Sequence, residues 1–316
     1  MSRAKSPSPS PSGISTQSIV WAAIGWAALS LMFYLFFNAP TDGPHIIKPE
    51  DCTKAVNNLF VRPNWYRYGT YIFQTVAIAS SGLLCLRNWR SSKIISGRNV
   101  WLGLGIGILS WGIGNLIFGY LDFQYQSGLI NGGAKGAKDL VQTFPSIADI
   151  FFTATYVFLS WGMAMSVIGR RLNLYPKQWA IVGAVGFVGV AVAAYVTFFA
   201  GGGEITLDTS KILSIVYALG DIWLLIVATI LLLAFWGGKA AQSWRLLGSA
   251  GIAMFFGDLW FNYSINTGFS KICEGKQYQS GEPAEFFWIL AFILWGMAAA
   301  LEFDLSSRPT TRSRRS

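Results

Sequence analysis

The chain contains 316 residues, of which 53% are hydrophobic and 12% charged, and its formal net charge is +9. Soluble globular domains carry about a quarter of their residues as charged side chains, so this composition excludes an ordinary soluble domain and a disordered protein. It indicates a polytopic membrane protein. Membrane topology is expected to account for the positive charge, with no nucleic acid as a partner.

The apolar residues fall into eight long runs separated by polar loops. A helix needs about 20 mostly apolar residues to cross the hydrocarbon core, and only helices and closed barrels satisfy every backbone group in lipid. Since no alternating strand pattern is present, we predict an all-α polytopic protein with eight transmembrane helices in the lipid bilayer. The predicted spans are residues 19–38, 69–86, 100–121, 147–168, 179–200, 212–236, 245–264 and 284–301.

Positive charge predicts the orientation of these spans. A cytoplasmic N-terminus puts 15 of the 24 Lys and Arg residues into the tails and inner loops, as the positive-inside rule requires. Both termini are therefore expected to be cytoplasmic, with a disordered tail over residues 1–18 and a basic tail over residues 302–316. We expect a prokaryotic plasma membrane, or an internal membrane such as the thylakoid if the source is a phototroph.

Two segments of the sequence resemble each other. Residues 114–120 (GNLIFGY) and 257–263 (GDLWFNY) share a Gly, an acid or amide, a Leu, a Phe and a Tyr at the same spacing. Each is followed by a loop and by a helix start with an acid and two Phe residues, at residues 145–152 and 282–287. We predict two parallel four-helix repeats, residues 19–168 and 179–301, because an even number of spans preserves direction.

Four acidic residues lie within the predicted spans or at their ends, where ionisable groups are costly and often functional. Apart from Arg245, the first residue of one span, no Lys or Arg falls inside a predicted span to pair with them. Two of the four occupy the first turn of a helix, where a carboxylate also caps free N–H groups, so binding and capping are both open for this pair. The first-turn acids are Asp149 and Glu285, and the other two are Asp221 and Asp258.

Asp221 and Asp258 are the strongest candidates for a ligand site. Helical spacing places Tyr217 on the face of Asp221 and Asn262 on the face of Asp258. Asn115 occupies the position equivalent to Asp258 in the first repeat. Such a polar cluster in the outer half of the bundle would bind a cation, a proton or a polar ligand. The alternative is an interhelical hydrogen-bond network that only holds the bundle together.

Catalytic and metal-binding patterns are absent from the sequence. His45 is the only histidine, which excludes bis-histidine haem and Ser-His-Asp catalysis, and no phosphate-binding loop is present. We therefore expect neither an enzyme nor a metal site, and the sequence identifies no cofactor. Cys52 and Cys273 both fall in predicted outer loops, so we predict a disulfide between them, with two free thiols as the alternative. Cys85 is expected to be a buried apolar residue.

One family resemblance follows from the repeated motif. The stretch from Gly114 to Tyr120, followed by Phe144, Pro145, Ser146 and the residues to Phe151, resembles a multi-span sensory membrane module. That module is found N-terminal to diguanylate cyclase and histidine kinase domains in bacteria and archaea, and in it a Pro-Ser-x-x-Asp helix start follows an Asn-bearing span. The resemblance implies a sensing function. Because no output domain follows the last span, it also implies signalling through a partner protein.

Three functions are compatible with these features. The first is an integral membrane binding or sensing module that takes a ligand in an outer-half polar pocket and acts through a partner protein. The second is an accessory or assembly subunit of a larger membrane complex. The third is a proton- or cation-coupled transporter, which is less favoured because such transporters use Gly- or Pro-interrupted spans and no Pro lies inside a predicted span.

Overall fold

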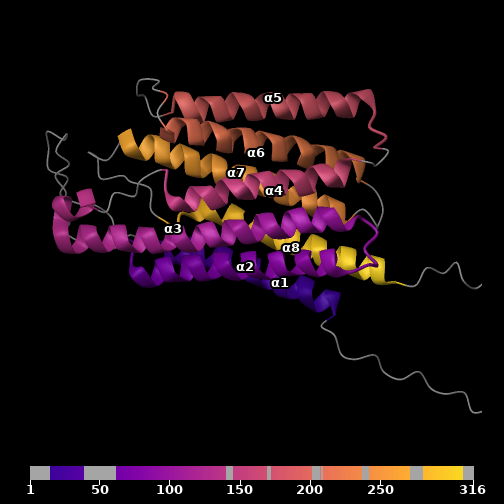
Figure 1. The fold of residues 1–316 in the computed structure, drawn as a ribbon, viewed down its shortest axis with the longest axis horizontal. Coiled ribbons are helices and arrows are strands. Elements are labelled where there is room, and N and C mark those ends of the chain that lie inside the picture. The colour runs from indigo at the N-terminus through magenta and orange to yellow at the C-terminus, as the bar shows by residue number, and fades with distance from the viewer. Residues whose placement is uncertain are drawn as a thin grey trace, which may run out of the picture.

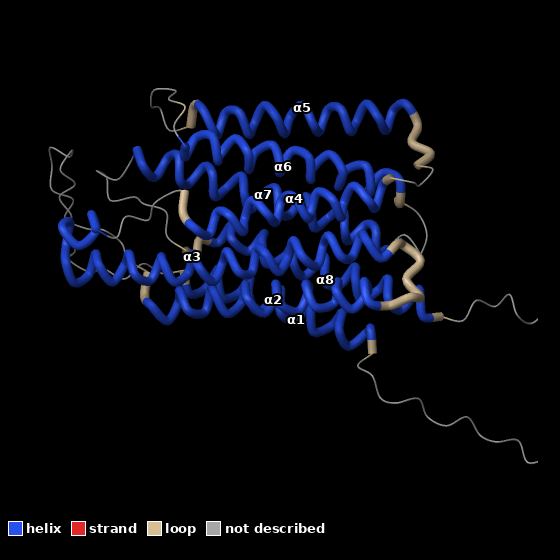
Figure 2. The backbone as a smooth tube through the Cα atoms, in the orientation of Figure 1, coloured by secondary structure: helices blue, strands red, loops and turns tan. Residues whose placement is uncertain are grey.

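The fold is seen in a computed structural model that describes residues 15–38, 62–139, 145–168, 172–200, 207, 209–236, 242–270 and 280–308. Side chains are described throughout these ranges except at residues 125–139 and 268–270. The described residues form helices and connecting turns and contain no strand (Figure 2). The predicted all-helical class is therefore confirmed for this part of the chain.

Long α-helices follow one another along the described residues, and a short 3-10 helix precedes the last of them. They are α1 (Thr16–Phe37), α2 (Asn64–Arg90), α3 (Arg98–Asp139), α4 (Ile147–Val167), α5 (Pro176–Phe198), α6 (Thr209–Ala234), α7 (Gln242–Ser270), η3 (Pro283–Glu285) and α8 (Phe286–Ser307).

Several helices begin at residues that favour a helix start. The Ser15 side chain caps α1 by accepting from the backbone N–H of Ser18 at 3.1 Å. Ser146 caps α4 in the same manner. Pro176 is the first residue of α5, a position at which proline removes no helical hydrogen bond.

Consecutive helices run in opposite directions, so their ends gather at two ends of an elongated bundle (Figure 1). Contacts between helix termini agree with this arrangement. The start of α5 meets the end of α6 through Gln178 and Leu233, and the start of α6 meets the end of α5 through Lys211 and Thr197. We call the end where α1 begins and α8 finishes the basic end, and the other the opposite end. The basic end carries Arg87, Arg90, Lys93, Arg98, Arg245 and Arg308.

Small residues allow α3 to contact its neighbours closely. A Cβ added to Gly103 of α3 would lie 2.7 Å from the Cα of Gly162 in α4, so the two backbones touch, which small residues at a helix interface permit. Gly105 faces Leu86 of α2 in the same manner. Elsewhere, α2 packs against α8, α6 packs against α4 and α7, α1 lies mainly on α8, and α5 lies on α6.

Most of these helices have the length and composition of membrane spans. Seven of the described helices are long and apolar enough to cross a bilayer, and α7 is not among them. Large apolar side chains such as Phe36 of α1 and Phe187 of α5 are each 75% exposed, a surface that suits lipid and not water. The described chain therefore has the features of an integral, multi-pass membrane protein in a lipid bilayer.

The helices extend beyond the predicted spans, and this changes the charge pattern. α2 begins at Asn64 and α6 at Thr209, so Arg67 and Lys211 lie inside helices. The helices therefore contain basic residues that lie outside the shorter predicted spans. A hydropathy run stops at the first polar turn, whereas backbone hydrogen bonding continues through it, and Arg67 is fully buried because an acid of α3 compensates its charge.

Candidate functional site

Two acidic side chains meet at one tyrosine hydroxyl in the interior of the bundle. The Tyr156 hydroxyl of α4 lies 2.7 Å from Oδ1 of Asp221 in α6 and 2.8 Å from Oδ2 of Asp258 in α7. Asp221 is 3% exposed and Asp258 is 4% exposed. Three helices thus converge on a pair of buried carboxyl groups.

A tryptophan supplies the remaining contact to the pair. The indole Nε1–H of Trp288 in α8 donates to Oδ1 of Asp258 at 2.9 Å. Within the described part of the chain, no Lys or Arg contacts Asp221 or Asp258. The pair is therefore held by neutral donors alone, without a compensating cation.

A third acid, Asp149, lies between the carboxyl pair and the opposite end of the bundle. Asp149 closes a capping box at the start of α4, where its Oδ2 accepts from the backbone N–H of Ser146 at 2.5 Å and from the Ser146 hydroxyl at 2.9 Å. Capping, one of the two roles left open for Asp149, is therefore observed. Its Oδ1 also accepts from the Tyr217 hydroxyl of α6 at 2.6 Å, so this carboxylate both caps α4 and ties it to α6.

Helical spacing explains why these side chains meet. Tyr217 and Asp221 are four residues apart and Asp149 and Tyr156 are seven apart, so each pair shares one face of its helix. The Tyr156 and Tyr217 rings lie 5.6 Å apart and connect the two acidic positions. We call this group of six residues the carboxyl cluster. Its members are Asp149, Tyr156, Tyr217, Asp221, Asp258 and Trp288.

On the basic-end side, apolar side chains close off the cluster. Leu224 of α6, Met163 of α4 and Met254 of α7 are fully buried one turn or more below the carboxyl pair. A Cβ added to Gly251 of α7 would lie within 3.5 Å of Ala228, Leu224 and Met163, so the three helices pack here without spare room. The polar groups of the cluster therefore continue toward the opposite end and not toward the basic end.

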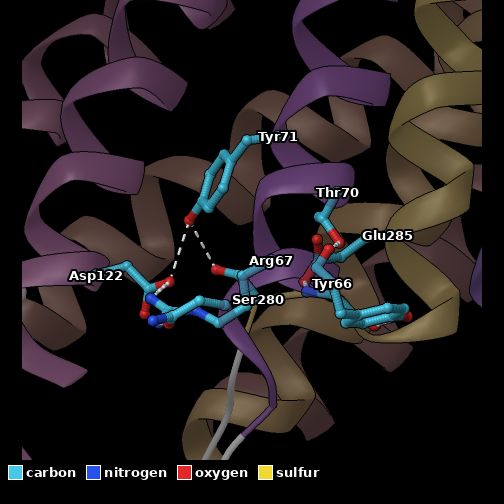
Figure 3. Close-up of polar contacts among 9 residues, drawn as sticks. Tyr66, Arg67, Thr70, Tyr71, Asp122, Ser280 and Glu285 are labelled. Atoms are coloured by element: carbon cyan, nitrogen blue, oxygen red, sulfur yellow. Dashed lines mark hydrogen bonds and ion pairs between the residues drawn. The ribbon is translucent and has the colours of Figure 1, made fainter. Parts of the chain in front are cut away.

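A separate polar group lies where α2, α3 and the segment before α8 meet (Figure 3). Arg67 of α2 forms a buried ion pair with Asp122 of α3, with Nη2 2.5 Å from Oδ2. The Tyr71 hydroxyl of α2 lies 3.4 Å from the same Oδ2 of Asp122 and 2.8 Å from the hydroxyl of Ser280. We call Arg67, Tyr71, Asp122 and Ser280 the ion-pair cluster.

Glu285 lies beside the ion-pair cluster and shapes the turn before α8. Its Oε1 accepts from the backbone N–H of Gly281 at 2.8 Å and of Glu282 at 3.3 Å, and its Oε2 accepts from Gln74 of α2 at 2.9 Å. Gly281 has a φ of 103°, which favours glycine. Glu285 thus holds this turn against α2, away from the carboxyl cluster.

The predicted site residues are only partly brought together. Asp149, Tyr217, Asp221 and Asp258 lie in one cluster. The Asn262 amide donates to the backbone carbonyl of Asp258 at 3.0 Å and not to its carboxyl group. Asn115 of α3 is buried, but its Nδ2 has no hydrogen-bond partner among the described residues.

Sequence reasoning missed the residue at the centre of the cluster, Tyr156. The available signal was its position two turns after Asp149 on the same face of α4, but an aromatic residue in a span is usually explained by packing. The Arg67–Asp122 ion pair was missed because both residues were assigned to outer loops. Its partners lie 55 positions apart in the chain, and no local pattern connects them.

Other predictions concern metals and cysteines. The described residues contain no group of three or more His, Cys, Asp or Glu side chains that could hold a metal ion. Cys85 is free and buried, as expected. Cys52 and Cys273, the predicted disulfide partners, lie outside the described residues.

Comparisons with known proteins found no match. No protein-family model, no curated protein and no solved structure matches this chain. The chemistry of the carboxyl cluster therefore rests on the geometry of its own residues.

Proposed function

We propose that the chain is a membrane-embedded binding or sensing module, that the carboxyl cluster is its site, and that the ligand is a proton. The observation that carries this proposal is the single Tyr156 hydroxyl between Asp221 and Asp258. A hydroxyl has one hydrogen to donate, and an ionised carboxylate is only an acceptor. Both contacts can be hydrogen bonds only if one carboxyl group carries a proton.

The surrounding donors suggest which acid holds this proton. Asp258 accepts from the indole of Trp288 and from Tyr156, which is the environment of an ionised carboxylate. Asp221 then donates its proton to the oxygen of Tyr156. Two ionised carboxylates in one buried site without a basic partner would pay a desolvation cost that nothing offsets. Loss of the proton would therefore weaken the contact of α6 with α4 and α7.

The path by which protons would reach the carboxyl pair supports sensing and not transport. The polar side chains of Tyr217, Asp149 and Ser146 lead from the carboxyl pair toward the opposite end, whereas apolar packing closes the basic-end side. With the basic end placed in the cytoplasm, as the positive-inside rule suggests, the site exchanges protons with the outer side. A coupled transporter needs access from both sides.

The proposal is tested by the pH dependence of stability. The folded protein would hold a proton on Asp221 that an unfolded chain releases at neutral pH, so stability falls as pH rises, by at most about 1.4 kcal/mol per pH unit for one proton. Unfolding of the detergent-purified protein is followed between pH 5 and 9 for the wild type and for Asp221→Asn. The substitution is expected to flatten this slope.

A matched control uses an acid that the proposal does not involve. Asp304 is paired with the exposed Arg308 near the end of α8, so Asp304→Asn should keep the wild-type slope. If Asp221→Asn keeps the wild-type slope as well, the carboxyl pair does not hold the proton.

The proposed module acts through a partner protein, and this part separates it from an accessory subunit. Purification in mild detergent, with mass spectrometry of the proteins recovered, is carried out for the wild type and for Asp221→Asn. A partner whose recovery changes with the substitution supports sensing. A partner recovered equally with both proteins supports an accessory or assembly subunit.

The proposal also includes eight spans arranged as two parallel repeats, with both termini cytoplasmic in a prokaryotic plasma membrane or an internal membrane such as the thylakoid. Equivalent contacts support the repeats. Tyr217 of α6 donates to Asp149 at the start of α4, and Gln74 of α2 donates to Glu285 at the start of α8. In each case the second helix of one half contacts the last helix of the other half.

The repeated Gly motif supports the same relation. A Cβ added to Gly114 of α3 would meet the ring of Phe152 in α4, and one added to Gly257 of α7 would meet the ring of Trp288 in α8. The outer helices differ, because α1 lies mainly on α8 whereas α5 lies on α6. Only the second half carries the carboxyl pair, since Asn115 stands where the other half has Asp258.

A further inference from the structure

The outermost helices of the two halves lie on different neighbours (Figure 1). α1 lies mainly on α8 and also contacts α2, so it covers the seam between these two helices. α5 lies on α6 and α7 instead. In the proposed repeats, the seam between α4 and α6 is equivalent to that between α8 and α2. No helix of the described chain covers it.

Two contacts show how α1 covers the first seam. The indole Nε1–H of Trp26 donates to the backbone carbonyl of Phe73 in α2 at 3.1 Å. A Cβ added to Gly69 of α2 would meet the ring of Phe33 in α1. The side chains of α1 thus fill the space beside the first half of α2.

The equivalent positions of α6 are open. Tyr217 of α6 corresponds to Gln74 of α2, because each donates to the acid at the start of a last helix. Counted from Tyr217, Ile212 and Val216 stand where α1 contacts α2, and both are exposed. Aliphatic side chains therefore lie uncovered where the first half has a helix.

The same difference separates α8 from α4. Ile293 lies eight residues after Glu285, and Val157 lies eight residues after Asp149. Ile293 is 6% exposed, whereas Val157 is 62% exposed. Similar side chains at equivalent positions are thus covered in one half and open in the other.

The open seam lies directly beside the carboxyl cluster. A Cβ added to Gly220 of α6 would meet the ring of Tyr156 in α4, so these two residues mark the contact between the helices. Val157 follows Tyr156 and Leu219 precedes Gly220, and both are exposed. We call this surface the α4–α6 seam. Its exposed apolar residues include Ile150, Val157 and Trp161 of α4 and Val216, Leu219 and Trp223 of α6.

Two tryptophans indicate what covers the α4–α6 seam. Trp161 and Trp223 are exposed, and neither indole N–H has an acceptor among the described residues. Trp223 lies near the middle of α6 (Thr209–Ala234), away from the headgroup region where exposed tryptophans are favoured. Acyl chains offer no acceptor, and an unsatisfied donor in hydrocarbon costs free energy. The backbone of another helix supplies one, as Phe73 does for Trp26.

We propose that the α4–α6 seam binds one transmembrane helix of a partner membrane protein, in the position that α1 takes on α8 and α2. This inference rests on the proposed function, which requires a partner protein. The partner helix is apolar, and small residues on its inner face let it approach the bulky side chains of the seam. It runs antiparallel to α4, as α1 runs antiparallel to α8. The α1 helix of a second copy does not fit, because α1 already buries its inner face on α8.

The position of the seam connects the partner to the carboxyl pair. Tyr156 contacts Asp221 and Asp258 with its hydroxyl and Gly220 with its ring. Loss of the proposed proton weakens the contact of α6 with α4, and these two helices form both sides of the seam. A helix bound there responds to their separation.

Photo-cross-linking in the native membrane tests the proposal. Ile150, Val157 and Trp161 are each replaced by p-benzoylphenylalanine, and Phe187 on the exposed face of α5 is the control position. Mass spectrometry identifies the cross-linked peptides. The three seam positions are expected to link to one transmembrane segment of one other protein, and Phe187 to none. The residue linked from Ile150 should lie about 11 residues C-terminal to that linked from Trp161, because the two antiparallel helices rise equally per residue.

Matched substitutions provide a second measurement. Val157→Trp fills the seam, whereas Val188→Trp adds the same bulk to the exposed face of α5. Recovery of the cross-linked protein with the detergent-purified chain should fall about tenfold for Val157→Trp, which corresponds to about 1.4 kcal/mol. Recovery with Val188→Trp should stay at the wild-type level.

Several results would overturn the proposal. They are cross-links to lipid alone, to this chain or a second copy of it, or to segments of many proteins, a reversed order of the linked residues, and equal losses with the two Trp variants. None of these results depends on the protonation of Asp221. The seam can therefore fail while the pH slope of Asp221→Asn is as predicted, and the pH slope can fail while the seam binds its helix.

Discussion

The ion-pair cluster and the carboxyl cluster solve the same problem in two ways. Each buries an aspartate beside a tyrosine hydroxyl. In the first, Asp122 faces the guanidinium of Arg67 at 2.5 Å, and in the second, Asp221 faces Asp258 across Tyr156. Arg67 compensates the first acid, whereas the proposed function places a proton on one of the two acids of the carboxyl pair.

Under the proposed function, this difference separates a structural contact from a proton-binding one. An arginine stays charged at all physiological pH values, so the Arg67–Asp122 pair ties α2 to α3 under all such conditions. A proton shared by two carboxyl groups can leave. The proposal therefore gives the carboxyl cluster two states, whereas the ion-pair cluster has one.

The largest expected loss of stability comes from breaking the Arg67–Asp122 ion pair. Asp122→Ala leaves the fully buried Arg67 without a counter-charge, and such a loss costs about 3–5 kcal/mol. Chemical unfolding in detergent measures it. The control is Asp304→Ala, which removes an exposed ion pair and should have little effect. Similar small losses in both variants would show that Arg67 finds another partner.

A smaller loss is expected when the shared hydroxyl is removed. Tyr156→Phe leaves Asp221 and Asp258 facing each other without the bridge, and an unsatisfied buried polar group costs about 1–3 kcal/mol. Tyr195→Phe on the exposed face of α5 is the matched control, measured by the same unfolding assay. If the two substitutions cost the same, Tyr156 contributes by packing alone.

The sequence determined the helices better than it determined the partners of the polar residues. Among the described residues, hydropathy located every long helix, and helical spacing placed Tyr217 with Asp221. The meeting of Asp221 with Asp258 depends on the packing of α4, α6 and α7, which no local pattern encodes. The side-chain contact of Tyr156 with both acids depends on it equally.

The start of α2 shows why a hydropathy window misplaces a helix boundary at a charged residue. A hydropathy window treats Arg67 as a residue that must face water, and it therefore begins the span after it. Burial of Arg67 becomes favourable only once Asp122 of another helix is beside it. Information of this kind belongs to pairs of residues distant in the chain.

The smallest expected change in stability distinguishes the roles of Asp221 and Asp258. At neutral pH, Asp221→Asn should change the free energy of unfolding by less than about 1 kcal/mol, because an amide N–H can replace the acid O–H as the donor to Tyr156. Asp258→Asn should cost more, since an amide has one acceptor oxygen for the two donors Trp288 and Tyr156. The reverse order would place the proton on Asp258.

The central claim is that Asp221 carries a proton at neutral pH, and infrared spectroscopy tests it most directly. A protonated carboxylic acid has a carbonyl stretch that is separate from the bands of carboxylate and amide groups. The wild-type protein in detergent at pH 7 is predicted to show this band, Asp221→Asn to lack it, and Asp304→Asn to keep it. Equal bands in the wild type and Asp221→Asn, or no band in the wild type, would contradict the account.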